Sequence, residues 1–201
     1  MIEPHAGFSP QRELHRCLLV VAGTFLILLT INIRGGCAFD GRPSERLIRE
    51  LRWGVAAHDV DGLWSGASDE DGPDILAGVV FNRPLFHLLS GNAYPEVGGS
   101  INTRGHTSKL FGGLLLQWEF AGPVFFATGV GLALHNGELD TNRPNRKSLG
   151  SRLLFRIPIE IGIAFEHHHR FMIVFDHVSN AGLARPNEGL DTLGVIYGYR
   201  F

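Results

Sequence analysis

Cysteine and charge are both scarce in this chain of 201 residues. The two cysteines, Cys17 and Cys37, lie near the amino terminus, so the rest of the chain contains neither a disulfide framework nor a cysteine metal site. Charged residues make up 19% of the sequence, and the net charge of −2 argues against a nucleic-acid-binding face. Glycine, with 26 residues, and phenylalanine, with 14, are abundant instead, which favours an all-β protein with many turns.

One apolar run is long enough to be considered as a membrane helix, and it lies near the amino terminus. Two arginines precede this run over 17–33, and small residues follow it up to Ala38. The order of a positive region, an apolar stretch and small residues predicts a secretory signal peptide over 1–38. The alternative is a permanent anchor, since the run is near the lower length limit for a spanning helix. Cleavage after Ala38 would leave one domain, a β-barrel, over 39–201.

The remaining chain alternates apolar and polar residues with a period of two, which is typical of β-strands. In 151–166, Phe155 and Ile163 belong to an unbroken apolar face. Arg156 and Glu160 belong to the opposite face. The same pattern predicts eight antiparallel strands, over 49–58, 73–82, 94–103, 110–120, 124–135, 151–166, 170–179 and 191–201.

Alternation alone fits both a soluble barrel with its apolar face inside and a membrane barrel with that face outside. Three features favour the membrane. The apolar faces are unbroken, and the opposite faces mix small residues with both charge signs, as the narrow lumen of eight strands requires. The chain also ends on YGYRF (197–201), which resembles the last strand of bacterial outer-membrane barrels. We therefore predict an eight-stranded antiparallel transmembrane β-barrel whose lumen charges form buried ion pairs.

Connection lengths predict the orientation, because outer-membrane barrels keep short turns on the periplasmic side and longer loops outside. The expected external loops are 59–72, 103–108, 136–150 and 180–190, and the expected periplasmic turns are 83–93, 121–123 and 167–169. The connection over 83–93 is longer than a turn requires, and the sequence offers no reason for it.

Three polar residues continue the apolar rows at the predicted external rim. His177 and Ser179 extend the lipid-facing row of strand 170–179, and Asp191 extends the row of the following strand. Polar groups that face hydrocarbon are costly unless they interact with one another. A structural wall would have little use for this pattern, which therefore indicates a site.

These residue types suit acyl transfer. Residues two apart on one strand face are about 7 Å apart at Cα, so His177 can reach the Ser179 hydroxyl and take its proton. A carboxylate on the far imidazole nitrogen would fix the tautomer and stabilise the imidazolium. Asp191 has the right face for this role, and Glu188, in the preceding loop, is the alternative acid.

An oxyanion would also need N–H donors, and the nearest ones belong to Asn180 and Gly182. A non-catalytic interpretation stays open at this point. His-x-Ser by itself is a weak signal, and a polar pair at a barrel rim is often only hydrated interface.

A resemblance to a known family rests on two runs next to these polar residues. The runs HVSNAG (177–182) and PNEGLD (186–191) look like the signature of the PagL-type lipid A 3-O-deacylases, the acyloxyacyl hydrolase-like family. The resemblance implies an outer-membrane barrel with an outward-facing Ser–His–acid site that hydrolyses the ester-linked acyl chain at the 3-position of lipid A. It also implies that Asn180 belongs to the oxyanion hole and that the family acid, commonly Glu, falls on Asp191.

The implied partners are lipid A in lipopolysaccharide and the outer membrane itself, with no metal, cofactor or nucleic acid. Arg143, Arg146 and Lys147 could pair with lipid A phosphates, although a hydrated loop explains them equally well. Two other function classes stay open, a non-catalytic structural or adhesion barrel and another outer-membrane lipid esterase or acyltransferase. The sequence does not choose between a monomer and a homodimer, and it does not fix the preferred acyl-chain length.

Overall fold

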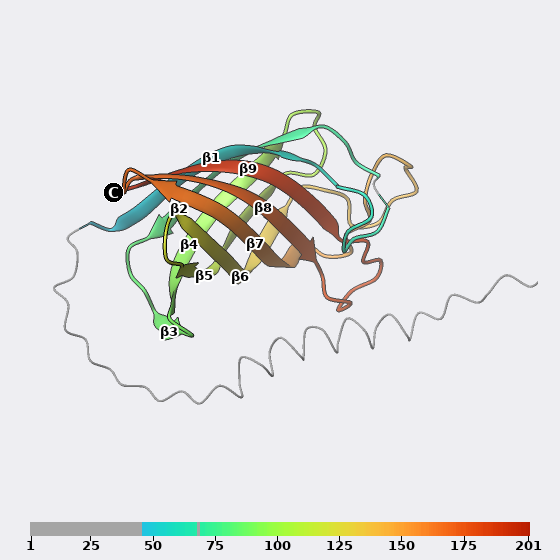
Figure 1. The fold of residues 1–201 in the computed structure, drawn as a ribbon. Coiled ribbons are helices and arrows are strands. Elements are labelled where there is room, and N and C mark those ends of the chain that lie inside the picture. Colours follow the sequence, from blue (N-terminus) through green and yellow to red (C-terminus); the bar gives the residue numbers. More distant parts are fainter. Residues whose placement is uncertain (1–45, 68) are drawn as a thin grey trace, which may run out of the picture. The chain divides into compact units, whose positions relative to one another are not determined.

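A computed structural model describes residues 46–67 and 69–201, which form a closed antiparallel barrel (Figure 1). Its wall consists of β1 (Ile48–Ala57), β2 (Pro73–Phe81), β4 (Gly91–Asn102), β5 (Lys109–Glu119), β6 (Val124–His135), β7 (Leu153–Phe165), β8 (His169–Ser179) and β9 (Leu190–Arg200). Pairing of β1 with β9 and of β2 with β4 closes the ring. The predicted eight-stranded barrel is therefore confirmed, whereas the predicted signal peptide over 1–38 lies outside the described residues.

Among the residues described, no helix is long and apolar enough to cross a membrane.

Apolar side chains cover the outer surface of the wall. On β7, Phe155 and Ile163 are 46% and 50% exposed, whereas Arg156 and Glu160 are 4% and 1% exposed. A soluble barrel would bury the apolar row and expose the charged one. The observed arrangement is that of a transmembrane barrel, with hydrocarbon outside and polar groups in the lumen.

One group of buried ion pairs lies in the lumen around Arg156. The Arg156 guanidinium binds Glu96, and its Nε lies 2.6 Å from Asp176 Oδ1. Lys109 Nζ also lies 2.7 Å from Asp176 Oδ2, as an ion pair. The Arg156 guanidinium lies 3.6 Å above the centroid of the Phe111 ring. These contacts tie four strands together across the barrel.

A second group of ion pairs lies around Glu50. Glu50 accepts from Arg52 at 2.8 Å and from Arg170 at 2.7 Å, and Arg52 also binds Glu160 at 2.8 Å. Arg170 lies 3.4 Å above the centroid of the Phe125 ring. Because a buried charge is costly without a partner, these residues fix which face of each strand points inward.

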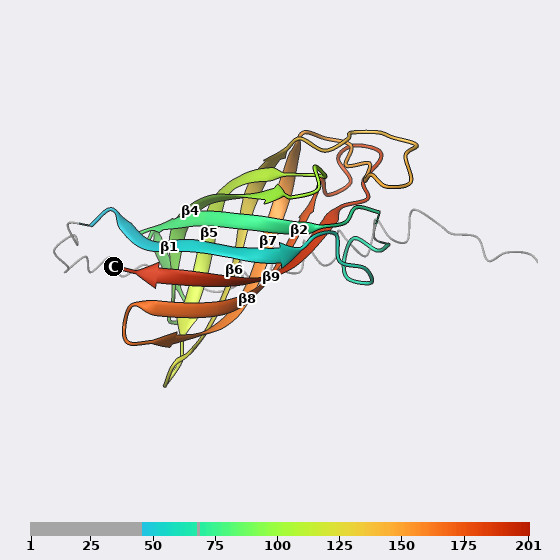
Figure 2. The ribbon, with the colours of Figure 1, turned by 90° about the horizontal axis from the view of Figure 1, so that it is seen from above.

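The two ends of the barrel differ in their connections, as predicted. Figure 2 shows three long connections, 58–72, 136–152 and 180–189, gathered at the end opposite to the carboxy terminus. The short connections 120–123 and 166–168 lie at the other end, where the Phe201 N–H donates to the Arg49 carbonyl.

The long connection over 83–93 contains a ninth, short strand. This strand, β3 (Phe86–Leu88), pairs with the first residues of β4, and the Trp118 Nε1–H donates to the Leu89 carbonyl at 3.1 Å. The prediction that the third long strand begins at residue 94 is therefore wrong, because β4 begins at Gly91. Glycine and asparagine favour strands poorly, and cross-strand pairing of Gly91 and Asn92 with β3 overrides that preference here.

The lumen ion pairs predict a large cost for removing Arg156. Replacing Arg156 with Met leaves Glu96 without its cation, and the free energy of unfolding should fall by about 3–5 kcal/mol. Urea unfolding of the refolded barrel in detergent micelles, followed by tryptophan fluorescence, measures this change. The control is Arg143→Met, because the Arg143 side chain is 70% exposed and lies 3.8 Å from Glu138. This control should change stability by less than about 1 kcal/mol, and equal losses in the two variants would contradict the account.

Candidate active site

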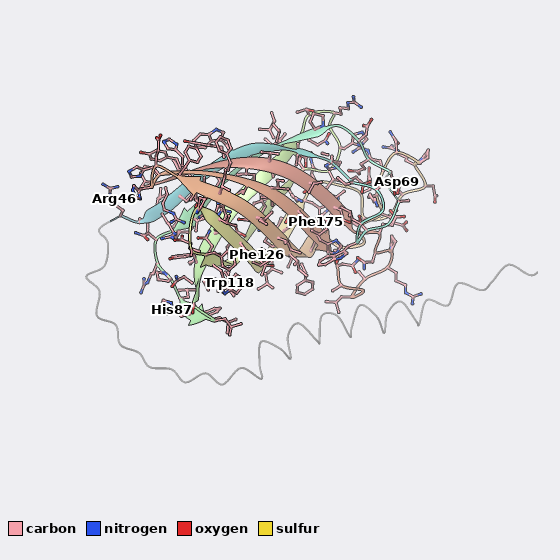
Figure 3. The ribbon with its side chains drawn as sticks, viewed as in Figure 1. Arg46, Asp69, His87, Trp118, Phe126 and Phe175 are labelled. Carbon is pink, nitrogen blue, oxygen red and sulfur yellow. The ribbon has the colours of Figure 1, made fainter. Side chains whose placement is uncertain are left out.

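Two antiparallel strands bring the predicted polar residues together on the outer wall. In the register of β8 and β9, His177 lies opposite Asp191 and Phe175 lies opposite Leu193. His177 and Ser179 continue the outward row that contains Phe175. Figure 3 shows Phe175 toward the end of the barrel that carries Asp69, away from Arg46. The site therefore lies on the lipid-facing wall at the end with the long connections.

The three side chains form a continuous chain of contacts. His177 Nδ1 lies 2.6 Å from Asp191 Oδ1, and His177 Nε2 lies 3.2 Å from Ser179 Oγ. With the Nδ1–H donated to the carboxylate, Nε2 is free to accept the serine proton. The Asp191 side chain is 0% exposed and that of His177 is 14% exposed, so water reaches this pair poorly.

The alternative acid, Glu188, lies elsewhere in the structure. Its carboxylate accepts the backbone N–H of Ser148, and its own N–H donates to the Ser148 carbonyl at 3.2 Å. These bonds join the last long connection to the 136–152 connection. The structure brings Asp191, and not Glu188, to the His177 imidazole.

The predicted oxyanion donors already form hydrogen bonds that stabilise the last long connection. The Asn180 side-chain amide donates to the carbonyls of Leu149 at 3.0 Å and Pro186 at 2.9 Å. Its carbonyl oxygen accepts the Gly182 N–H at 2.9 Å. Asn180 is only 2% exposed and holds this connection in place. To bind an oxyanion, an N–H of Asn180 or Gly182 would have to leave its present acceptor for the substrate oxygen. The oxyanion role of these two residues therefore stays a prediction.

The first long connection also contacts the site, and sequence reasoning missed it. The Ser65 N–H donates to Asp191 Oδ2 at 2.7 Å, and the Val60 N–H donates to the Asp191 carbonyl at 2.9 Å. The centroid of the Trp64 ring lies 5.1 Å from that of His177. Backbone donors leave no mark in a side-chain pattern, so the lone tryptophan in a polar connection was the available signal.

A second buried cluster holds the long connections to one another. His58 lies between two carboxylates, with Nε2 2.9 Å from Glu70 and Nδ1 2.9 Å from Asp74. Glu70 also accepts the backbone N–H groups of Thr107 at 2.8 Å and Lys147 at 3.2 Å. These bonds join the connection 58–72 to the connections 103–108 and 136–152.

Two members of this cluster, His58 and Glu70, have shifted pKa values. Burial alone would raise the pKa of Glu70, but hydrogen bonds from His58 and Thr107 outweigh it and lower the pKa to about 2. Burial alone would lower the pKa of His58, but its hydrogen bonds with Asp74 and Glu70 outweigh it and raise the pKa. Both shifts favour the charged forms, so the fold stabilises His58 as a cation and Glu70 as an anion.

Lys147 belongs to this cluster and not to a phosphate-binding surface. Its ammonium lies 3.2 Å from Asp59 and donates to the Ala67 carbonyl at 2.6 Å, and the residue is 1% exposed. The suggestion that Lys147 meets lipid A phosphates is therefore wrong, because folding of the connections buries it. Arg143 is exposed, and Arg146 donates to the Gly105 carbonyl at 3.1 Å.

Among the residues that the structure describes, no three His, Cys, Asp or Glu side chains are placed to hold a metal ion. In the histidine run at 167–169, His168 Nδ1 lies 2.7 Å from the Arg200 carbonyl oxygen. His169 Nδ1 contacts the Tyr197 hydroxyl. These two rings therefore bind separate partners.

Comparisons with known proteins relate the chain to one protein family. A family model described as "Lipid A 3-O-deacylase (PagL)" matches residues 78–200, which is more than half of the chain. The lipid A deacylase PagL of Pseudomonas aeruginosa is 34% identical over 83 residues, which cover 40% of this chain and 46% of that relative. The match thus spans about half of that relative's length.

Two further matches cover more of the chain. The lipid A deacylase PagL of Bordetella bronchiseptica is 26% identical over 126 residues, which cover 57% of this chain and 68% of that relative. The crystal structure of the outer membrane enzyme PagL matches with a TM-score of 0.57 and 22% identity, over 76% of this chain and 99% of that chain. At this identity the structural likeness supports the fold.

The His58 cluster predicts a pH window for the long connections. The raised pKa of His58 adds stability that is present below its ordinary value of 6.5 and is lost as the pH rises through the raised pKa. The lowered pKa of Glu70 adds stability that is present above 4.5 and is lost as the pH falls toward about 2. After correction for the intrinsic rate, hydrogen exchange in 58–72 should therefore accelerate as the pH rises above 6.5 and through the raised pKa of His58.

The matched variant for this measurement is His58→Gln, which keeps a hydrogen-bonding side chain but does not titrate. Its corrected exchange in 58–72 should be faster than in the parent and should show no step over the same pH range. If exchange in His58→Gln rises with pH by the same factor as in the parent, the titrating group lies outside this cluster.

Proposed function

Because the chain belongs to the PagL family of lipid A 3-O-deacylases, we propose that it hydrolyses the ester bond of the acyl chain at the 3-position of lipid A in the bacterial outer membrane. The observation that carries this proposal is the Asp191–His177–Ser179 chain of contacts on the lipid-facing wall. A serine esterase needs these three roles in this order.

In the proposed reaction, Ser179 Oγ attacks the ester carbonyl carbon while His177 Nε2 takes the hydroxyl proton. The tetrahedral intermediate collapses as the bond to the sugar oxygen breaks, and this oxygen takes the proton from the imidazolium. The acyl chain is then bound to Ser179 as an ester. Water attacks that ester with His177 again as the base, which releases the fatty acid and restores the serine hydroxyl.

Asp191 acts through His177. Its contact with Nδ1 directs Nε2 toward Ser179 and stabilises the imidazolium that forms during each step. The second carboxylate oxygen accepts the Ser65 N–H, which keeps the carboxylate from rotating away. All three groups belong to one chain, so the proposed reaction is the same for a monomer and for a homodimer.

The position of the site suits a lipid substrate. Ser179 lies opposite Phe155, and His177 lies opposite Ile157, so apolar side chains flank the reacting groups on β7. Acyl chains in the surrounding leaflet can approach these residues laterally without leaving hydrocarbon. The chemistry uses only side chains of the chain and water, with no cofactor in the proposed steps.

The proposal predicts that the serine hydroxyl is essential. Ser179→Ala should abolish release of the acyl chain while the barrel still folds, because a hydroxyl at the rim contributes little packing. His177→Asn should lose nearly as much, since the base and the nucleophile act as a unit. Mass spectrometry of lipid A from cells that express each variant measures the loss of the 3-linked chain.

The serine control for this experiment is Ser151→Ala, because the Ser151 hydroxyl donates to the Leu153 carbonyl at the start of β7. It should deacylate lipid A at the parental level. Unchanged deacylation in Ser179→Ala would refute the mechanism. A gain in mass of lipid A in cells that express the parent protein would indicate an acyltransferase. Unchanged lipid A in those cells would indicate a non-catalytic barrel.

A separate prediction concerns the two carboxylates. Asp191→Asn should lower deacylation at least about tenfold, equivalent to about 1.4 kcal/mol of transition-state stabilisation. Glu188→Gln should change it little, because the amide oxygen can still accept the Ser148 N–H. Both variants are compared at equal abundance in the outer membrane. A larger loss of deacylation in Glu188→Gln than in Asp191→Asn would show that the last long connection bends back over His177.

A further inference from the structure

The connection 58–72 folds onto the outer wall and covers the imidazole with a tryptophan. The Trp64 ring meets His177 edge to face, at 5.1 Å between centroids and 77° between planes. It meets Phe175 in the same way, at 5.4 Å and 88°. Trp64 therefore packs against two consecutive outward residues of β8.

The same turn also binds the acid. The Ser65 N–H, adjacent to Trp64, donates to Asp191 Oδ2 at 2.7 Å. The Gly62 N–H donates to the Gly66 carbonyl at 3.0 Å, which closes the turn around these two residues. One short turn thus contacts both the base and the acid of the proposed site.

The space around the imidazole is also closed on the side of Gly189. A Cβ atom at Gly189 would lie 3.4 Å from His177 Cε1 and 3.3 Å from Ser65 Cβ, and its backbone φ of +69° suits glycine. The ring therefore lies between Trp64, the backbone at Gly189 and the carboxylate of Asp191. This enclosure leaves the imidazole little room to rotate.

We propose that Trp64 is a positioning residue, whose ring holds the His177 imidazole in line between Asp191 and Ser179. The inference rests on the proposed esterase site but not on the family match, because Trp64 lies outside the matched segment 78–200. Small displacements of a catalytic base cost large factors in rate. Trp64 acts through His177, so its loss lowers the rate of the chemical step more than the affinity for the lipid.

A membrane anchor is the other role that a tryptophan at this rim could have, because indole rings favour the interface between water and lipid. Trp64 is 53% exposed, and Trp53 on β1 is 50% exposed on the same outer surface. Trp53 instead packs on Tyr197, with centroids 4.7 Å apart, and lies opposite Ala77 on β2. These two residues therefore separate anchoring from positioning.

The first test compares the kinetics of variants at these two positions, with lipid A in mixed micelles and with p-nitrophenyl butyrate. Trp64→Ala should lower kcat about tenfold on both substrates with KM little changed, and Trp64→Phe should recover most of the loss. Trp53→Ala should match the parent. Unchanged kcat in Trp64→Ala, a change confined to KM, or an equal loss in Trp64→Phe would overturn the inference.

The two substrates also separate this inference from the proposed function. If the parent hydrolyses only the p-nitrophenyl ester, and Trp64→Ala lowers that activity, the lipid A assignment fails and the positioning role is supported. If the parent hydrolyses lipid A and Trp64→Ala does so equally well, the assignment is supported and the positioning role fails.

The second test does not depend on turnover. Trp53→Phe together with Trp118→Phe leaves Trp64 as the only one of the 3 tryptophans in the chain. Because the indole ring contacts the His177 ring, His177→Asn should change the emission of Trp64 at one fixed pH. Emission that is the same with and without His177 would overturn the inference.

Discussion

A charge inside a narrow barrel needs a counter-charge close by, and this requirement sets which face of each strand points inward. Arg156 reaches Glu96 and Asp176 from one face of β7, while Ile157 and Phe155 point outward from the other. A slip of one residue in register would place the guanidinium in hydrocarbon and an isoleucine in the lumen. The lumen ion pairs therefore also fix the outward direction of the residues that follow on β8.

The site combines a rigid part and a part that closes over it. Paired strands supply His177, Ser179 and Asp191, and their register sets the acid directly opposite the base. The connection 58–72 supplies Trp64 and the Ser65 N–H, which cover the imidazole and bind the carboxylate. The His58 cluster ties this connection to its neighbours, so the cover over the site is itself supported by buried ion pairs.

Much of this arrangement could be predicted from the sequence, because strands have a period of exactly two residues along the chain. Alternation predicted the eight strands, the outward faces and the position of Asp191 on the outward row of the strand next to that of His177. Alternation could not predict the approach of Ser65 to Asp191 or the burial of Lys147, because both depend on how separate connections fold together. It also missed β3, whose pairing with Gly91–Ala93 overrides the weak strand preference of glycine and asparagine.

The claim on which the account depends is that His177 activates Ser179 on the outer wall. The most direct measurement is covalent labelling of the folded barrel with a long-chain alkyl fluorophosphonate, followed by peptide mass mapping. The account predicts one modified residue, Ser179, and loss of that modification in His177→Asn. Modification of a different serine, or undiminished labelling of Ser179 without His177, would contradict it.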